Sequence, residues 1–203
     1  MIARYRLVEL VIAVSVVVIS VASLFVAVYQ GQVMDRTLAA SVMPIMDYTT
    51  GNFSDEHQDS RIELEVRNNG LGPAQVHYLT LSYQGEPITA PERFIPQCCA
   101  PEDMSPEEQE HHIRELFRSG RLSLLTDIVG GRVFAPQQRV VFATMTRPED
   151  PDSLAVWEAF NQARHQLELE ICYCSVLEDC WTARFPQQDR TPVARCEPRP
   201  GGI

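Results

Sequence analysis

An apolar run near the N-terminus limits what this chain can be more than any other feature. Residues 7–29 read LVELVIAVSVVVISVASLFVAVY and contain one charged residue, Glu9. At ~1.5 Å per residue, a helix of this length crosses the ~30 Å hydrocarbon core of a bilayer. The alternative is a cleaved signal peptide, but the apolar core of a signal peptide usually has only ~7 to 15 residues. The sequence therefore predicts an uncleaved transmembrane helix over residues 7–29.

The charges on either side of the run predict its orientation. Arg4 and Arg6 precede it, whereas Arg36 after it is accompanied by Asp35. Because positive residues tend to stay on the cytoplasmic side, we expect the N-terminus in the cytoplasm and the chain after the run outside it. The six cysteines agree with this, since disulfides form outside the reducing cytoplasm. We expect a single-pass protein of a bacterial-type inner membrane with a periplasmic C-terminal domain.

Strict alternation of apolar and polar residues predicts the fold of the remaining chain. The alternation runs on both sides of an Asn/Gly/Pro-rich loop, as in two half-buried strands joined by that loop. We expect a mainly β protein, in which the transmembrane helix precedes an antiparallel immunoglobulin-like β-sandwich with a partly helical insertion. The expected segments are a cytoplasmic N-terminus (1–6), the helix (7–29), a stalk (30–40), the sandwich (41–186) with its insertion (87–136), and a loose C-terminal tail (187–203).

One helix of the predicted insertion is marked by its first residues. Ser105 as N-cap, Pro106 at the first helical position and Glu108 three residues after the cap form a capping box. His111 and His112 suggest a metal site at first sight, but adjacent residues on a helix point about 100° apart and cannot easily bind one ion together. We interpret this helix as having a solvated, charged face and predict no metal.

The loop between the alternating stretches contains Asn69, Gly70, Gly72 and Pro73. Exposed backbone N–H groups at glycines can bind anions, which is one interpretation of this loop. The simpler interpretation is structural: the glycines supply positive φ angles and the proline fixes the exit into the next strand. We expect the structural role.

Two motifs of this chain resemble those of a group of uncharacterised bacterial single-pass membrane proteins. The first is the N-x-G-x-G-P-A pattern in NNGLGPAQV, residues 68–76, and the second is the Y-C-S…C-W ending in YCSVLEDCW, residues 173–181. The resemblance covers the anchor and both halves of the predicted sandwich but not the insertion. It implies a location and a fold, and it implies no activity.

The composition excludes several kinds of chemistry. All seventeen basic residues are arginine, so a lysine Schiff base or a P-loop lysine is impossible. No G-x-S-x-G motif is present, and no catalytic group of side chains can be assembled from spacing alone. The net charge of −10 disfavours nucleic acid as a partner. We predict no catalytic residues, no cofactor and no enzyme activity.

What remains is a membrane-anchored binding module whose partner is a protein or an envelope component. The alternatives are an accessory subunit of a larger membrane assembly and, less favoured, a thiol- or metal-dependent enzyme. Self-association through the membrane helix is a further hypothesis, since small residues let a second helix approach closely. The small residues lie at Ala13, Ser20, Ser23 and Ala27.

The cysteines have neither zinc-site nor C-x-x-C spacing, so we predict structural disulfides. Because side chains alternate along a strand, Cys172 and Cys174 are expected on the outer face of the last sheet, opposite Leu169 and Ile171. Cys174 and Cys180 flank a short turn and are expected to pair. A bridge between neighbours Cys98 and Cys99 would be strained, so we expect one of them to reach Cys172 and the other to reach Cys196.

Overall fold

The structure is a computed structural model that describes residues 2–101 and 103–197. The chain divides into two compact units, which meet between Ser41 and Val42. The first unit is a single long helix, α1 (Ile2–Ser41), which contains the predicted membrane span and continues through the predicted stalk. By length and composition this helix is apolar enough to cross a membrane. The prediction of a long apolar N-terminal helix is therefore confirmed.

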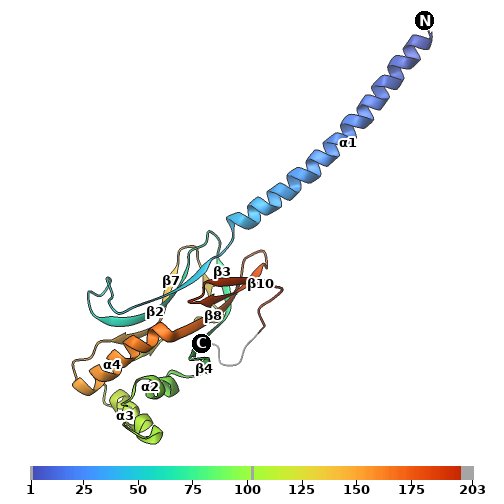
Figure 1. Ribbon diagram of the computed structural model, residues 1–203. Helices are drawn as coiled ribbons and strands as arrows, with labels where there is room; N and C mark the ends of the chain where they lie inside the picture. The colour runs from blue at the N-terminus through green and yellow to red at the C-terminus, as the bar shows by residue number, and fades with distance from the viewer. Residues whose placement is uncertain (1, 102, 198–203) are drawn as a thin grey trace. The chain divides into compact units, whose positions relative to one another are not determined.

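The second unit contains two antiparallel sheets (Figure 1). The first has the strand order β1-β2-β7-β5, and the second has the order β10-β9-β8-β3-β4, with β6 paired to the beginning of β3. The strands of the first sheet are β1 (Met46–Gly51), β2 (Arg61–Asn68), β7 (Arg139–Thr146) and β5 (Leu125–Thr126). Those of the second are β3 (Ala74–Tyr83), β4 (Glu86–Ile88), β6 (Val133–Phe134), β8 (Leu167–Cys174), β9 (Cys180–Phe185) and β10 (Asp189–Val193). The prediction of a mainly β domain is confirmed.

One hydrophobic core is shared by both sheets. The alternation seen in the sequence gives β2 one buried apolar face, formed by residues 62, 64 and 66. The apolar residues of β8 face the same core, and burial of each such side chain contributes about 1.5 to 3 kcal/mol. The core residues of the four central strands include Ile62, Leu64, Val66, Val76, Leu79, Leu81, Phe142, Met145, Leu169 and Ile171.

The predicted insertion is more closely built into the fold than the sequence indicated. It contains α2 (Pro91–Cys99) and α3 (Pro106–Arg118), and the capping box at the start of α3 is present. Figure 1 shows both helices together with α4 (Pro151–Ala163), which a short 3-10 turn (Arg164–Gln166) joins to β8. The insertion also supplies β5 and most of β4, which form one edge of each sheet, and β6, which pairs with β3.

The prediction of a loose tail after residue 187 is wrong for its first part. β10 pairs with β9 in antiparallel register, from Asp189 opposite Arg184 to Val193 opposite Cys180. In addition, the Arg190 guanidinium lies 5.2 Å from the centre of the Trp181 ring, a cation–π contact. Pro192 does not prevent this pairing, because β10 is an edge strand and proline is tolerated there. Residues 198–203 of the predicted tail lie outside the described residues.

Candidate functional site

The glycine-rich loop has a structural role, but not for the reason that the sequence suggested. Neither Gly70 nor Gly72 has a positive φ. Instead, a Cβ atom at Gly70 would lie 2.5 Å from the Ile45 backbone nitrogen, and one at Gly72 would overlap the Val42 carbonyl group. The glycines are needed because residues 42–45, the segment that enters the domain, pass directly against them. The predicted positive φ angles are therefore a wrong explanation of these residues.

Asn68 organises this loop, whereas the sequence analysis had named its neighbour. The Asn68 side chain is fully buried, and its Oδ1 accepts hydrogen bonds from the backbone N–H groups of Ile45 (3.2 Å) and Gly70 (2.9 Å). Its Nδ2 donates to the carbonyl oxygens of Gly72 (2.8 Å) and Ala135 (3.2 Å). One amide therefore ties the entering segment, the loop and the residue directly after β6 to each other.

By contrast, Asn69 is exposed, and its side chain makes one hydrogen bond, to Asp47. Pro73 is half-buried and immediately precedes β3, as expected for a residue that fixes the entry into a strand.

All six cysteines are paired. Cys174 bonds to Cys180 across the β8–β9 hairpin, the pairing expected from the turn. Cys172 bonds to Cys196, so the tail after β10 is tied back onto β8. The third bridge joins Cys98 to Cys99 at the end of α2.

The predicted staple from the insertion to Cys172 is therefore wrong. Cys99 belongs to the hydrophobic core, and Cys98 packs against it. Cys172 and Cys174 are not part of that core, because they lie on the other face of β8 from Ile171 and Tyr173. The sheet itself separates the α2 cysteines from Cys172, so no bridge can form between them.

A histidine that the sequence analysis did not select lies beside two of the sulfur atoms. His77 sits at a break in the pairing of β3 with β8, where Val76 faces Tyr173 but Tyr78 already faces Cys172. His77 is thus the extra residue of a β-bulge, a feature that re-aims a side chain. The sequence carried a signal for it, because the apolar residues change phase between Val76 and the pair Leu79 and Leu81.

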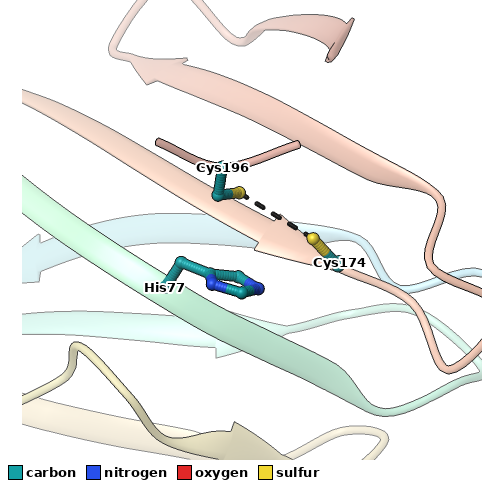
Figure 2. Close-up of side chains that lie close together, drawn as sticks. All are labelled: His77, Cys174 and Cys196. Atoms are coloured by element: carbon teal, nitrogen blue, oxygen red, sulfur yellow. Dashed lines mark hydrogen bonds between the residues drawn. The ribbon is translucent and has the colours of Figure 1, made fainter. Parts of the chain in front are cut away.

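Figure 2 shows the resulting cluster of His77, Cys174 and Cys196, contributed by β3, β8 and the tail. The sulfur atoms of Cys174 and Cys196 are 3.9 Å apart, although each is bonded to a different cysteine. The ligand atoms of all three residues lie within 4.8 Å of one another. Histidine and thiolate are zinc ligands, but a sulfur in a disulfide is not a thiolate, so this cluster in its paired state is suited to sulfur chemistry.

A groove is lined by residues of α3 and by Leu124 and Thr126 at β5. Its volume is about 330 Å³, near the lower end for ligand pockets. Ile113, Phe117 and Leu124 give it an apolar floor, and Arg114 and Arg118 flank it. Arg114 forms an ion pair with Glu110, whereas no ion pair of Arg118 is found within the described residues. The groove can therefore hold an apolar group that has an anionic group beside it.

The four small residues of α1 are exposed along the helix. The hydroxyl groups of Ser20 and Ser23 donate to the carbonyl oxygens of Val16 and Ile19, both at 2.8 Å. The serines therefore satisfy their own polar groups and do not need a partner to do so. Self-association through this face stays a prediction.

No protein-family model, curated protein or solved structure matches this chain. Its function is therefore inferred from its own residues.

Proposed function

We propose that this chain is a single-pass inner-membrane protein of bacterial type, with an immunoglobulin-like sandwich in the periplasm that serves as a binding module. The apolar helix α1, the arginines at positions 4 and 6, and three disulfides in the second unit support this location. Two antiparallel sheets with a shared core support the sandwich. The resemblance to anchored bacterial proteins with the same loop and hairpin motifs agrees with both.

The groove between α3 and β5 carries the proposal of binding. The domain is strongly acidic, yet the charged residues that line the groove are Glu110, Arg114 and Arg118, and Glu110 is paired with Arg114. A protein segment that inserts an apolar side chain and places a carboxylate beside Arg118 fits this combination. We therefore propose a protein partner with an acidic, partly apolar recognition segment.

The location is tested with reporter fusions. A C-terminal fusion to an enzyme that is active only outside the cytoplasm is expected to be active, and the same fusion to a protein that fluoresces only in the cytoplasm is expected to be dark. Exchanging Arg4 and Arg6 for glutamate while placing two arginines after residue 30 is the control and should reverse both signals. An inactive enzyme fusion together with a bright fluorescent fusion in the natural sequence would refute the proposed topology.

The binding surface is tested by photo-crosslinking in cells. A photoreactive amino acid at Phe117 is expected to capture a specific partner, whereas the same amino acid at Val176, an exposed apolar residue in the β8–β9 turn, is not. Introducing Arg118→Glu is expected to lower the yield at Phe117 about fivefold, equivalent to a loss of ~1 kcal/mol. Arg195→Glu, in the tail, is the matched control. Equal yields at both probe positions would contradict the groove as binding surface.

A further inference from the structure

We propose that Cys172, Cys174, Cys180 and Cys196 form a disulfide-exchange site, in which a thiolate released at Cys174 attacks the neighbouring bridge at Cys196. The domain would thereby accept two electrons from an external dithiol and keep its tail attached through a new bridge. This inference does not depend on the proposed binding function.

The first observation is the arrangement of the sulfur atoms. Thiol–disulfide exchange requires a thiolate in contact with one sulfur of a disulfide. The Cys174 and Cys196 sulfurs are 3.9 Å apart, which is already close to van der Waals contact, while each is bonded to its own partner (Figure 2). Cys172 and Cys174 are alternate residues on one face of β8, so their two bridges lie side by side. Their contact places the atoms for exchange before any bond is broken.

The second observation is the histidine beside these atoms. His77 is turned toward the cluster by the β-bulge in β3, and its ring nitrogen lies within 4.8 Å of both sulfurs. A histidine next to a cysteine favours the thiolate over the thiol, and the thiolate is the nucleophile. Its exposed position also gives the cluster access to solvent. The nucleophile Cys174, the target bridge at Cys196 and the stabilising group His77 therefore lie next to one another.

The third observation concerns access to the first bridge. Cys180 follows a turn whose residues from Val176 to Asp179 are all exposed. Cys180 itself is only 8% exposed, and Cys172 and Cys174 are also buried, whereas Cys196 is half-exposed. An incoming thiol therefore reaches Cys180 where this exposed turn opens; the Cys180 sulfur lies 3.4 Å from the Glu178 carbonyl oxygen of the turn.

The exchange proceeds in three steps that conserve atoms and electrons. One thiolate of the external dithiol attacks the Cys180 sulfur, forms a mixed disulfide with it, and leaves the bonding electron pair on Cys174 as a thiolate. The Cys174 thiolate attacks the Cys196 sulfur, forms the Cys174 to Cys196 bond, and releases Cys172 as a thiolate that takes up a proton. The second thiol of the dithiol then attacks the mixed disulfide and releases Cys180. The dithiol has become a disulfide, and Cys172 and Cys180 have become thiols.

Two matched variants test the exchange step without any external reductant. Cys180→Ala leaves Cys174 as a free thiol beside the intact tail bridge, and Cys174→Ala leaves Cys180 free instead. Each full-length protein is incubated in detergent, treated with N-ethylmaleimide, and digested with chymotrypsin. Cleavage after Tyr173 separates Cys172 from Cys174, so mass spectrometry shows which cysteine carries the maleimide.

In the Cys180→Ala protein we expect maleimide on Cys172, together with a Cys174 to Cys196 bridge, in more than about one molecule in ten. This fraction corresponds to less than ~1.4 kcal/mol between the two pairings. In the Cys174→Ala protein we expect maleimide on Cys180 alone. Labelling of only Cys174 in the Cys180→Ala protein, with the Cys172 to Cys196 bridge unchanged, would overturn the proposal, as would equal exchange in both variants.

The role of the histidine is tested in the Cys180→Ala background. There, His77→Ala is expected to slow maleimide labelling of Cys174 several-fold, and His77→Arg, which places a fixed positive charge beside the sulfur atoms, is expected to recover most of the rate. His165→Ala, an exposed histidine outside the cluster, is the control and should leave the rate unchanged. A His77→Ala rate equal to that of the control would remove His77 from the site.

Discussion

Replacing Asn68 by alanine is expected to destabilise the domain by about 3 to 5 kcal/mol, the largest effect of any single polar substitution considered for this chain. The reason is that one buried amide serves groups from several parts of the fold. Its removal leaves the N–H groups of Ile45 and Gly70 and the Gly72 carbonyl oxygen without their partner. Each buried polar group that loses its hydrogen bond costs about 1 to 3 kcal/mol, and water entering the cavity recovers part of this.

Denaturant unfolding of the detergent-solubilised protein, followed by tryptophan fluorescence, measures this effect. Both tryptophans, Trp157 and Trp181, lie in the second unit, so the signal reports on the β domain. Asn69→Ala is the matched control, because this neighbour is exposed and makes one side-chain hydrogen bond. Its change should stay within about 0.5 kcal/mol. A loss of less than 1 kcal/mol for Asn68→Ala would show that the amide does not hold the loop.

Gly72→Ala is expected to cost about 3 kcal/mol or more, although it adds a single methyl group. The added Cβ would overlap backbone atoms of Val42, which cannot turn away as a flexible side chain can. The φ angle at Gly72 is compatible with alanine, so the whole cost comes from this contact. Relief requires the entering segment to leave its place, which would also weaken the hydrogen bond from Ile45 to Asn68.

Gly51→Ala is the control for the second prediction. A Cβ atom there would lie 3.8 Å from the Phe53 carbonyl oxygen, an ordinary contact, and its φ is likewise not positive. Replacing glycine at such a position is neutral or stabilises by a few tenths of a kcal/mol, because the unfolded chain loses freedom. If Gly72→Ala and Gly51→Ala shifted the denaturation midpoint by the same amount, the role assigned to Gly72 would be contradicted.

The sequence contained enough information for the main architecture because local patterns determine it. The apolar run predicted α1, the alternation at residues 62–66 predicted β2, and the pattern Ser105, Pro106 and Glu108 predicted the start of α3. Each of these signals depends only on residues close to one another in the chain. The helix α2 was missed because it is short and contains Pro96, which usually signals the end of a helix.

The candidate site was less predictable, since it depends on contacts between distant segments. Asn68, and not Asn69, is the buried amide because its side chain faces the entering segment. The positions of the two residues in the sequence do not show which side chain does so. The pairing of Cys172 with Cys196 depends on β10, which returns the tail to the sheet. Two parts of the site left a trace in the sequence: the short turn between Cys174 and Cys180, and the change of phase between Val76 and Leu79 at the bulge.

The pairing of early strands with late ones has a consequence for the order in which this chain acquires its structure. β2 pairs with β7, and β3 pairs with β8. Neither sheet can therefore form completely until strands that are synthesised much later are available. Until then, one edge of β2 and one edge of β3 have no partner strand and the core between the sheets is incomplete, a condition in which newly made proteins aggregate readily. Such non-local pairing also slows folding once the chain is complete. A ribosome-bound chain that ends before residue 139 should therefore depend on chaperones, whereas one that extends beyond the last cysteine should not.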